Sequence, residues 1–284
     1  MIPMPTTQNM VALLEALPGY DWLQGRLQGL KDADSARDLY MAYTLCAQHF
    51  ADTPMKGAEQ THSLFGIHPP SEKEYARLSL LHAALEDRAA FYTPKVLKLI
   101  QVADTGELIT FLRYLVVLPE HKQFVFAAVE ALRTNIADVF EAIALNNPYP
   151  KAFFNEQQWN QMYLKAAFMQ LDLTQIDGVE ERANNNLTRI ISDYAHERWA
   201  ASRQIDPCIW RPVSPFLDAV LLTDMKRLFG SDYKAERLAG YLVAKKAGSA
   251  DLQEEIKHNA ALETEIPEGN PWEAVRDLWT SELN

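Results

Sequence analysis

The spacing of hydrophobic residues along the chain is helical almost throughout. Leu39, Ala42, Tyr43 and Cys46 recur at steps of three and four residues, which is the period of one face of an α-helix. No run of alternating apolar and polar residues interrupts this pattern, and no Asn-Gly or Asp-Gly hairpin turn is present. The sequence therefore predicts an all-α fold.

Capping residues mark several helix starts. Ser71 and Glu74 have the capping-box spacing, in which each side chain accepts a hydrogen bond from the other residue's backbone. A cap followed by proline also predicts helices that begin at Thr93–Pro94, Ser214–Pro215 and Asn270–Pro271.

The middle of the chain has a regular rhythm, with helices expected to begin near residues 92, 106, 121 and 136. Helix pairs of roughly thirty residues stack into α-solenoids. We therefore predict an irregular α-α superhelix of stacked, HEAT-like helix pairs, with an irregular helical bundle as the alternative. We expect one domain over 1–284, a mobile loop at 51–72 and a motif-rich centre at 146–218.

Charge and composition narrow the function. The net charge of −11 repels a phosphate backbone, so no nucleic-acid partner is expected. The apolar run "LITFLRYLVVLP" is broken by Arg113 and too short to cross a bilayer, so direct membrane insertion is not expected. The N-terminus does not have the pattern of a signal peptide, and Cys46 and Cys208 are too few for a disulfide framework. These features predict a cytoplasmic protein.

The helix expected at 155–171 has apolar side chains around most of its circumference, which predicts burial on all sides. Its polar residues then need partners. Asn160, Gln161 and Lys165 are candidates for binding, because a buried ammonium requires an opposite charge or loses its proton.

The helix expected at 186–203 presents an apolar stripe that includes Ile191 and Tyr194, and Arg198 projects into it. Ser192 is expected on the far face. We interpret the ionic residues of the two helices as one polar cluster: Lys165, Asp193, His196, Glu197, Arg198 and Arg203. Ion pairs that only hold helices together would give the same pattern. The tryptophans Trp159, Trp199 and Trp210 fit packing anchors as well as a ligand cage.

Other chemistry is not indicated. The chain has no Gly-x-Ser-x-Gly elbow, no phosphate-binding glycine loop and no zinc-protease helix. An acidic residue three positions before a histidine occurs at Glu59–His62, Asp193–His196 and Glu255–His258, but an inward-facing set of acids on four helices is not visible. We predict no metal and no cofactor.

Two long segments carry a family resemblance. "NPYPKAFFNEQQWNQMYLKAAFM" at 147–169 and "YAHERWAASRQIDPCIWRPV" at 194–213 resemble the EboA family. Where members of that family often have "GLDRRAN", this chain has "GVEERAN" at 178–184, which alters the central acidic and basic pair. The motif covers Asn147, Tyr149, Trp159, Asn160, Gln161, Lys165, His196, Glu197, Arg198, Trp199, Arg203, Trp210 and Arg211.

The resemblance implies a role in bacterial gene clusters that move secondary-metabolite precursors from the cytoplasm toward the periplasm. It implies a small-molecule metabolite and other proteins of the same gene cluster as partners, and it transfers no catalytic role. The leading hypothesis is a binding or adaptor protein whose ligand-binding residues are Asn160, Gln161, Lys165, Asp193, His196, Glu197, Arg198, Trp199, Arg203, Trp210 and Arg211. One alternative is an enzyme with His196 as the general acid or base. Another is a scaffold for neighbouring enzymes.

Overall fold

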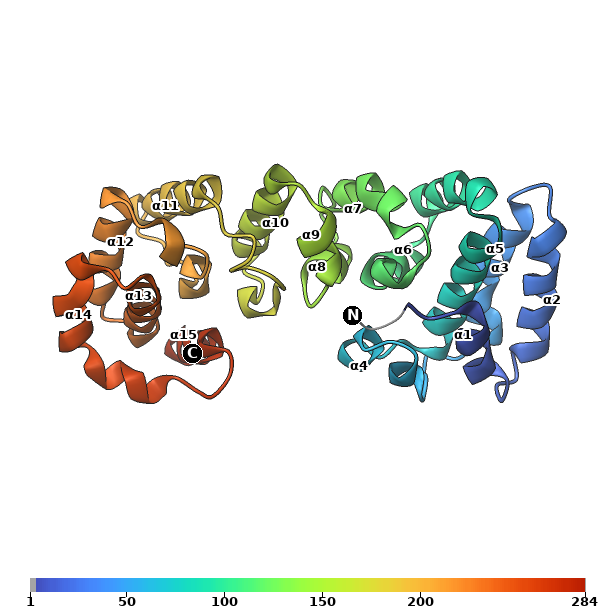
Figure 1. Ribbon diagram of the computed structural model, residues 1–284, viewed down its shortest axis with the longest axis horizontal. Coiled ribbons are helices and arrows are strands. Elements are labelled where there is room, and N and C mark those ends of the chain that lie inside the picture. The colour runs from blue at the N-terminus through green and yellow to red at the C-terminus, as the bar shows by residue number, and fades with distance from the viewer. Residues whose placement is uncertain (1–3, 284) are drawn as a thin grey trace. The chain divides into compact units, whose positions relative to one another are not determined.

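The computed structural model describes residues 4–283, and the prediction of an all-α fold is confirmed (Figure 1). Among these residues the only β-type pairing is one isolated bridge between Pro54 and Ser71. The chain contacts separate two compact units, one ending at Ile143 and one starting at Ala144. The single domain over 1–284 and the HEAT-like stacking of helix pairs stay predictions.

Four helices of the first unit pack against one long helix. This helix, α5, packs against α1, α2, α3 and α6. The α-helices are α1 (Thr7–Leu14), α2 (Tyr20–Asp32), α3 (Arg37–His49), α4 (Leu64–Ile67), α5 (Glu72–Val102), α6 (Thr105–Arg113), α7 (Val125–Ala131) and α8 (Ala137–Ala144). Short 3₁₀ helices occupy Ala58–Gln60, Leu115–Val117 and His121–Phe124.

The long helix α5 begins as predicted but is interrupted at a different place. Ser71 and Glu74 form the expected capping box. The predicted start at Thr93–Pro94 is wrong, because the break lies at Arg88, whose φ of −137° and ψ of 56° are not helical. The Arg88 guanidinium donates to the carbonyl oxygens of Lys31 (3.1 Å) and Ala33 (2.6 Å) at the end of α2. The break therefore accompanies a contact between helices that no local pattern predicts.

The segment 51–72 has more structure than the expected mobile loop. It contains the 3₁₀ helix Ala58–Gln60 and helix α4. The Met55 amide donates to the Pro70 carbonyl (2.8 Å), and the Glu72 amide donates to the Thr53 carbonyl (2.8 Å), which closes the segment at its base. Four of its apolar side chains are buried: Met55, Ala58, Leu64 and Phe65. Because its ends and its apolar residues have partners, the segment is part of the packed unit.

A buried histidine on α5 contacts the first helix, α1. The His82 side chain on α5 is buried and lies 2.9 Å, through Nδ1, from the Thr7 hydroxyl on α1. Burial lowers the pKa of His82 from its ordinary value of 6.5, although the Glu86 carboxylate partly opposes this shift. Since the unfolded chain binds the proton at a higher pH than the folded chain, acid favours unfolding.

We expect the free energy of unfolding to fall as the pH drops below about 6.5 and on through the lowered pKa of His82. His82→Gln keeps a hydrogen-bonding group but does not titrate, so its loss on acidification should be smaller. Urea unfolding at about pH 7.5 and about pH 5 measures the difference for both proteins. Equal losses in the two proteins would contradict the prediction.

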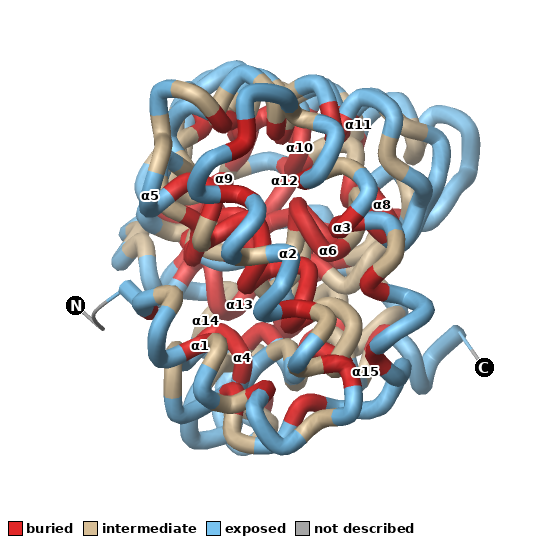
Figure 2. The backbone as a smooth tube through the Cα atoms, turned by 90° about the vertical axis from the view of Figure 1, so that its right-hand side faces the viewer, coloured by how far each residue is buried: buried red, intermediate tan, exposed pale blue. Residues whose placement is uncertain are grey.

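The second unit is built around α13. Figure 2 shows α13 as a largely buried stretch, and it packs against α12, α14 and α15. The α-helices are α9 (Pro148–Phe153), α10 (Glu156–Phe168), α11 (Asn185–Ala200), α12 (Ala219–Phe229), α13 (Lys234–Ala247), α14 (Gln253–His258) and α15 (Pro271–Leu283). The 3₁₀ helices are η4 (Leu173–Gln175), η5 (Pro207–Trp210), η6 (Ser214–Phe216), η7 (Ala250–Leu252) and η8 (Ala260–Glu265).

Two predictions for this unit need correction. The helix predicted to be buried on all sides, now α10, has an exposed Gln161 and an exposed Phe168, whereas α13 is the deeply buried helix. The start predicted at Ser214–Pro215 forms only the 3₁₀ helix η6, and Asp218 caps α12 through a hydrogen bond from the Leu221 amide (2.9 Å). The predicted start of the last helix at Asn270–Pro271 is confirmed.

Candidate functional site

The predicted site residues lie on α10, on α11 and on the turn that follows α11. Asn184 caps α11 by accepting the Leu187 amide (2.9 Å). The helix buries Leu187, Ile191 and Ala195, but Ser192, expected on the far face, is buried as well. The buried face of α11 therefore differs from the predicted one. It includes Ser192, whereas Asp193 and Glu197 point to solvent.

Asn160 has a structural partner rather than an open position. Its side-chain amide exchanges two hydrogen bonds with the side chain of Asn184, at 3.1 and 2.9 Å. The same Asn184 side chain caps α11. This pair consequently joins α10 to the start of α11, and it uses the amide group that the sequence suggested for a ligand.

Arg211 also holds a structural position. It binds Glu180 through two parallel hydrogen bonds, Nε to Oε1 at 2.7 Å and Nη2 to Oε2 at 2.8 Å. Burial is the largest single influence on Glu180 and opposes its ionisation, but the hydrogen bonds and charge of Arg211, with smaller contributions from other groups, together lower the pKa of this carboxyl. The neighbouring Glu181 bonds Lys151 (2.9 Å), so both altered residues of "GVEERAN" have basic partners.

The other predicted residues of α10 and α11 differ in exposure. Lys165 is half-buried, and burial lowers the pKa of its ammonium group. Gln161, Asp193 and Glu197 are exposed. The structure therefore does not gather the predicted ionic residues into one interior cluster.

His196 is held by an aspartate that the sequence did not indicate. The His196 side chain is 50% exposed, and its Nε2 lies 2.6 Å from Oδ1 of Asp224 on α12. Asp224 is buried, and its second oxygen accepts the Ser192 hydroxyl at 2.6 Å. Because the carboxylate lies between serine and histidine, the three residues do not form a Ser-His-Asp relay in which histidine activates serine. They connect α11 to α12 and fix the orientation of the imidazole.

Two of the predicted tryptophans form a stacked platform. Trp199 lies against Trp210 with ring centroids 5.9 Å apart and an angle of 24° between the planes. The Arg227 guanidinium covers the Trp199 ring at 4.2 Å. Trp210 is buried, and Trp159 is buried elsewhere in the unit beneath Arg182. Trp199 and Trp210 thus work together as packing elements, and Trp199 also lines a surface pocket.

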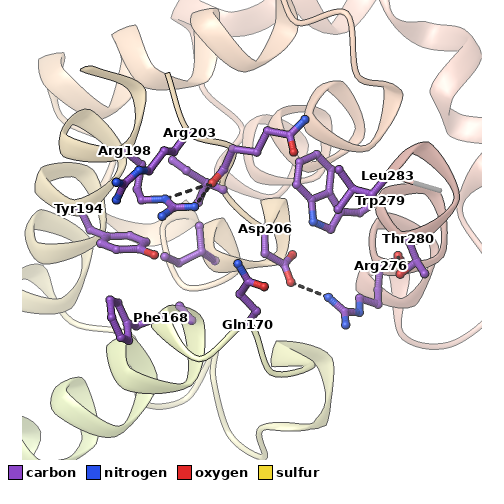
Figure 3. A pocket seen from close by; sticks show the side chains of 14 residues that line it. Phe168, Gln170, Tyr194, Arg198, Arg203, Asp206, Arg276, Trp279, Thr280 and Leu283 are labelled. Atoms are coloured by element: carbon purple, nitrogen blue, oxygen red, sulfur yellow. Dashed lines mark hydrogen bonds and ion pairs between the residues drawn. The ribbon is translucent and has the colours of Figure 1, made fainter. Parts of the chain in front are cut away.

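A group of charged side chains surrounds a pocket of about 440 Å³ between the end of α10, α11, η5 and α15 (Figure 3). Arg198, Arg203 and Arg276 line it, together with one carboxylate, Asp206. We call it the arginine pocket. Its apolar walls are formed by Ala167, Phe168, Ile205, Ile209, Trp279 and Leu283.

The polar groups of the arginine pocket differ in how they are paired. Arg276 donates to Oδ2 of Asp206 at 2.8 Å, and burial raises the pKa of this aspartate. Arg198 donates twice to the carbonyl oxygen of Gln204, at 3.1 and 2.7 Å, and this bond shapes the turn after α11. The Arg203 side chain is exposed and forms no hydrogen bond or ion pair with any residue from 4 to 283. The pocket therefore carries an excess of positive charge.

The sequence identified part of this pocket. Of the predicted ligand-binding residues, Arg198 and Arg203 line it, whereas Asn160, Lys165 and His196 do not. Sequence reasoning missed Asp206, Arg276 and Trp279, which come from η5 and from α15 about seventy residues further along the chain. The enzymatic hypothesis based on His196 stays a prediction.

The sequence was compared with the profiles of known protein families. The sequence profile described as "Metabolite traffic protein EboA" matches residues 15–214, more than half of the chain. The chain belongs to the EboA family. The matched range contributes α10, α11 and η5 to the arginine pocket, whereas α15 lies beyond it. In this EboA-family chain the Asn147 side chain caps α9 by accepting the Tyr149 amide (3.0 Å), which gives the start of the long motif a structural role.

No curated protein and no solved structure matches this EboA-family chain. Within residues 4–283, none of the helices is long and apolar enough to cross a membrane.

Proposed function

We propose that this EboA-family protein is a non-enzymatic binding protein that holds an anionic small molecule with an apolar body in the arginine pocket. The observation that carries the proposal is the combination of three guanidinium groups and one carboxylate around an apolar-walled pocket. Guanidinium groups bind carboxylates and phosphates through paired hydrogen bonds, which suits such a pocket to an anion.

The charge balance of the pocket supports an anionic ligand. Asp206 offsets the charge of Arg276. Arg198 bonds a neutral carbonyl oxygen, and the Arg203 guanidinium has no hydrogen bond or ion pair within the described residues, so neither charge is neutralised by a carboxylate. A pocket that bound a neutral molecule would gain little from these two groups.

An exposed aromatic side chain supports an apolar ligand body. Phe168 is 72% exposed although it lies at the end of a helix whose other large side chains pack inside the unit. It lines the pocket opposite residues such as Trp279, which is buried. Covering one side chain of this size contributes roughly 1.5–3 kcal/mol, or about a tenfold to hundredfold gain in affinity.

The family suggests where such a ligand belongs. We propose that the bound molecule is a secondary-metabolite precursor and that the protein carries or presents it on the cytoplasmic side of a route toward the periplasm. The family description, metabolite traffic, supports the role. The two free, buried cysteines, Cys46 and Cys208, are typical of a reducing compartment and support the location.

Naphthalene-2-carboxylate is a suitable probe, because it combines a carboxylate with a flat apolar body. We expect saturable binding by isothermal titration calorimetry, weakened about tenfold in Phe168→Ala and about tenfold in Arg203→Gln. Neither change should alter the melting temperature, because both side chains are exposed.

Matched controls come from the first unit. Phe126→Ala removes a phenylalanine that is 70% exposed, and Arg133→Gln removes an arginine that is 74% exposed. Both should bind the probe like the unmodified protein. Absence of saturable binding by the unmodified protein, or equal weakening in the controls, would refute the proposed function.

A further inference from the structure

A second pocket lies next to the arginine pocket, where α11 and α12 end and α13 begins. It has a volume of about 390 Å³ and shares Arg203 and Gln204 with the arginine pocket. Its charged lining differs, because two arginines, Arg203 and Arg227, face two carboxylates, Asp232 and Glu236. We call it the mixed-charge pocket.

The four charged side chains of the mixed-charge pocket are close enough for Arg227 to act electrostatically on Glu236, but they form no direct ion pairs with one another. Within residues 4–283, none of the four side chains forms an ion pair. Ser231 hydrogen-bonds Glu236, and Arg227 lies on the Trp199 ring instead of on a carboxylate. Opposite charges that surround one pocket without pairing leave room for a molecule that carries both charges.

Arg227 and Glu236 are held in place by their surroundings. The Trp199 ring beneath Arg227 is itself stacked on Trp210. Glu236 lies in the first turn of α13, and burial raises the pKa of its carboxyl, so a cation at this position would favour its ionised form. The Gln204 side-chain amide donates to the Tyr233 hydroxyl at 2.5 Å and borders the pocket.

The turn at the pocket's edge has a strained backbone. Ser202 follows the end of α11 with a φ of 53°, the left-handed region that glycine occupies more easily. Its amide donates to the Trp199 carbonyl (2.9 Å), and the Arg203 amide donates to the Arg198 carbonyl (2.9 Å). These two hydrogen bonds fix the backbone position of Arg203, three residues after the end of α11. Backbone strain of this kind is concentrated at functional sites.

We propose that the mixed-charge pocket binds the zwitterionic end of an α-amino acid. The carboxylate would bind Arg203 and Arg227, and the ammonium group would lie between Asp232 and Glu236. The proposal depends on the mixed-charge pocket alone and does not require a ligand in the arginine pocket.

L-Phenylalanine, 3-phenylpropanoate and 2-phenylethylamine test this assignment, because the last two each lack one charge. We expect L-phenylalanine to bind at least about tenfold more tightly than either analogue, since hydrogen bonds to charged groups are worth about 1.5–3 kcal/mol each. The affinities are read in NMR titrations from the chemical-shift changes of Gly230, Ser231 and Tyr233, which line the mixed-charge pocket and not the arginine pocket.

Two variants separate the charges. Glu236→Gln should weaken L-phenylalanine about tenfold and leave 3-phenylpropanoate unchanged, whereas Arg227→Gln should weaken both. If Arg227→Gln lowers the melting temperature, Arg227→Lys tests the same position, because it keeps the charge above Trp199 and removes the forked donor. Phe168→Ala serves as the control, because it alters only the arginine pocket and should bind L-phenylalanine normally.

Equal affinity of L-phenylalanine and 3-phenylpropanoate for the mixed-charge pocket would overturn the proposal, because Asp232 and Glu236 would then have no role in binding. Absence of saturable L-phenylalanine binding at millimolar concentrations would overturn it as well. Binding of naphthalene-2-carboxylate would be unaffected by either result, so failure here is distinguishable from failure of the proposed function.

Discussion

Replacing Arg77 with methionine is expected to lower the free energy of unfolding by about 3–5 kcal/mol. Arg77 on α5 and Glu107 on α6 are both buried, and Nη2 of Arg77 lies 3.6 Å from Oε1 of Glu107. The Arg77 Nε also donates to the Tyr43 carbonyl of α3 at 3.2 Å. Methionine fills a similar volume but leaves the Glu107 carboxylate inside the unit without its cation, and an unpaired buried charge is the costly outcome.

A second change separates the charge from the packing. Adding Glu107→Gln to Arg77→Met removes the orphaned charge and keeps a side chain that can accept the Asp104 amide, as Glu107 does at 3.1 Å. We expect the double variant to recover more than half of the lost stability in urea unfolding. Arg133→Met, which breaks an exposed pair with Glu130, is the control and should cost less than about 1 kcal/mol. A loss of less than about 1 kcal/mol for Arg77→Met would contradict the prediction that breaking the buried pair is costly.

The helix starts that the sequence predicted correctly are those decided by neighbouring residues. Ser71 with Glu74 and Asn270 with Pro271 satisfy backbone groups within one turn, so their signal is complete in the local sequence. The predicted start at Thr93 failed because Arg88, which binds carbonyl groups of α2, lies at the break instead. A cap pattern does not carry information about such a distant partner.

The candidate site was predictable only in part, for a similar reason. Arg198 and Arg203 were identified because they belong to a dense charged segment of one helix and its turn. Arg276 and Asp206, which complete the arginine pocket, are separated by 70 residues and meet only after α15 has packed against η5. The hydrophobic periodicity of a sequence predicts where helices form, but it does not show which helices will pack against each other.

The apolar circumference of α10 illustrates a different ambiguity. The sequence pattern predicted that α10 would be buried on all sides, yet Phe168 is exposed and lines the arginine pocket. A helix that packs against its own unit and a helix that offers an apolar wall to a ligand need the same residue types. The position of Phe168 therefore had to come from the structure, and it is what makes the naphthalene-2-carboxylate test specific.

Replacing Trp210 with alanine is expected to lower the free energy of unfolding by about 3–5 kcal/mol. Trp210 is buried in η5 and stacks on Trp199 of α11 with centroids 5.9 Å apart. Its segment is anchored from α10, where the Tyr163 hydroxyl contacts the carbonyl oxygens of Cys208 and Ile209 at 3.2 Å. Removing the indole leaves a cavity that this anchored segment cannot collapse to fill, so most of the transfer and packing energy is lost.

Trp210→Phe keeps an aromatic face against Trp199 and leaves a smaller cavity, so we expect it to cost no more than about half as much. Thermal unfolding followed by circular dichroism, together with urea titration, measures both variants. The Trp199 ring lies beneath Arg227, so the loss of its stacking partner should also affect the mixed-charge pocket. At temperatures where the variants are still folded, we expect Trp210→Ala to bind L-phenylalanine more weakly and Trp210→Phe to bind it almost normally. Equal stability losses for the two variants would show that the stacked platform is not what holds η5 against α11.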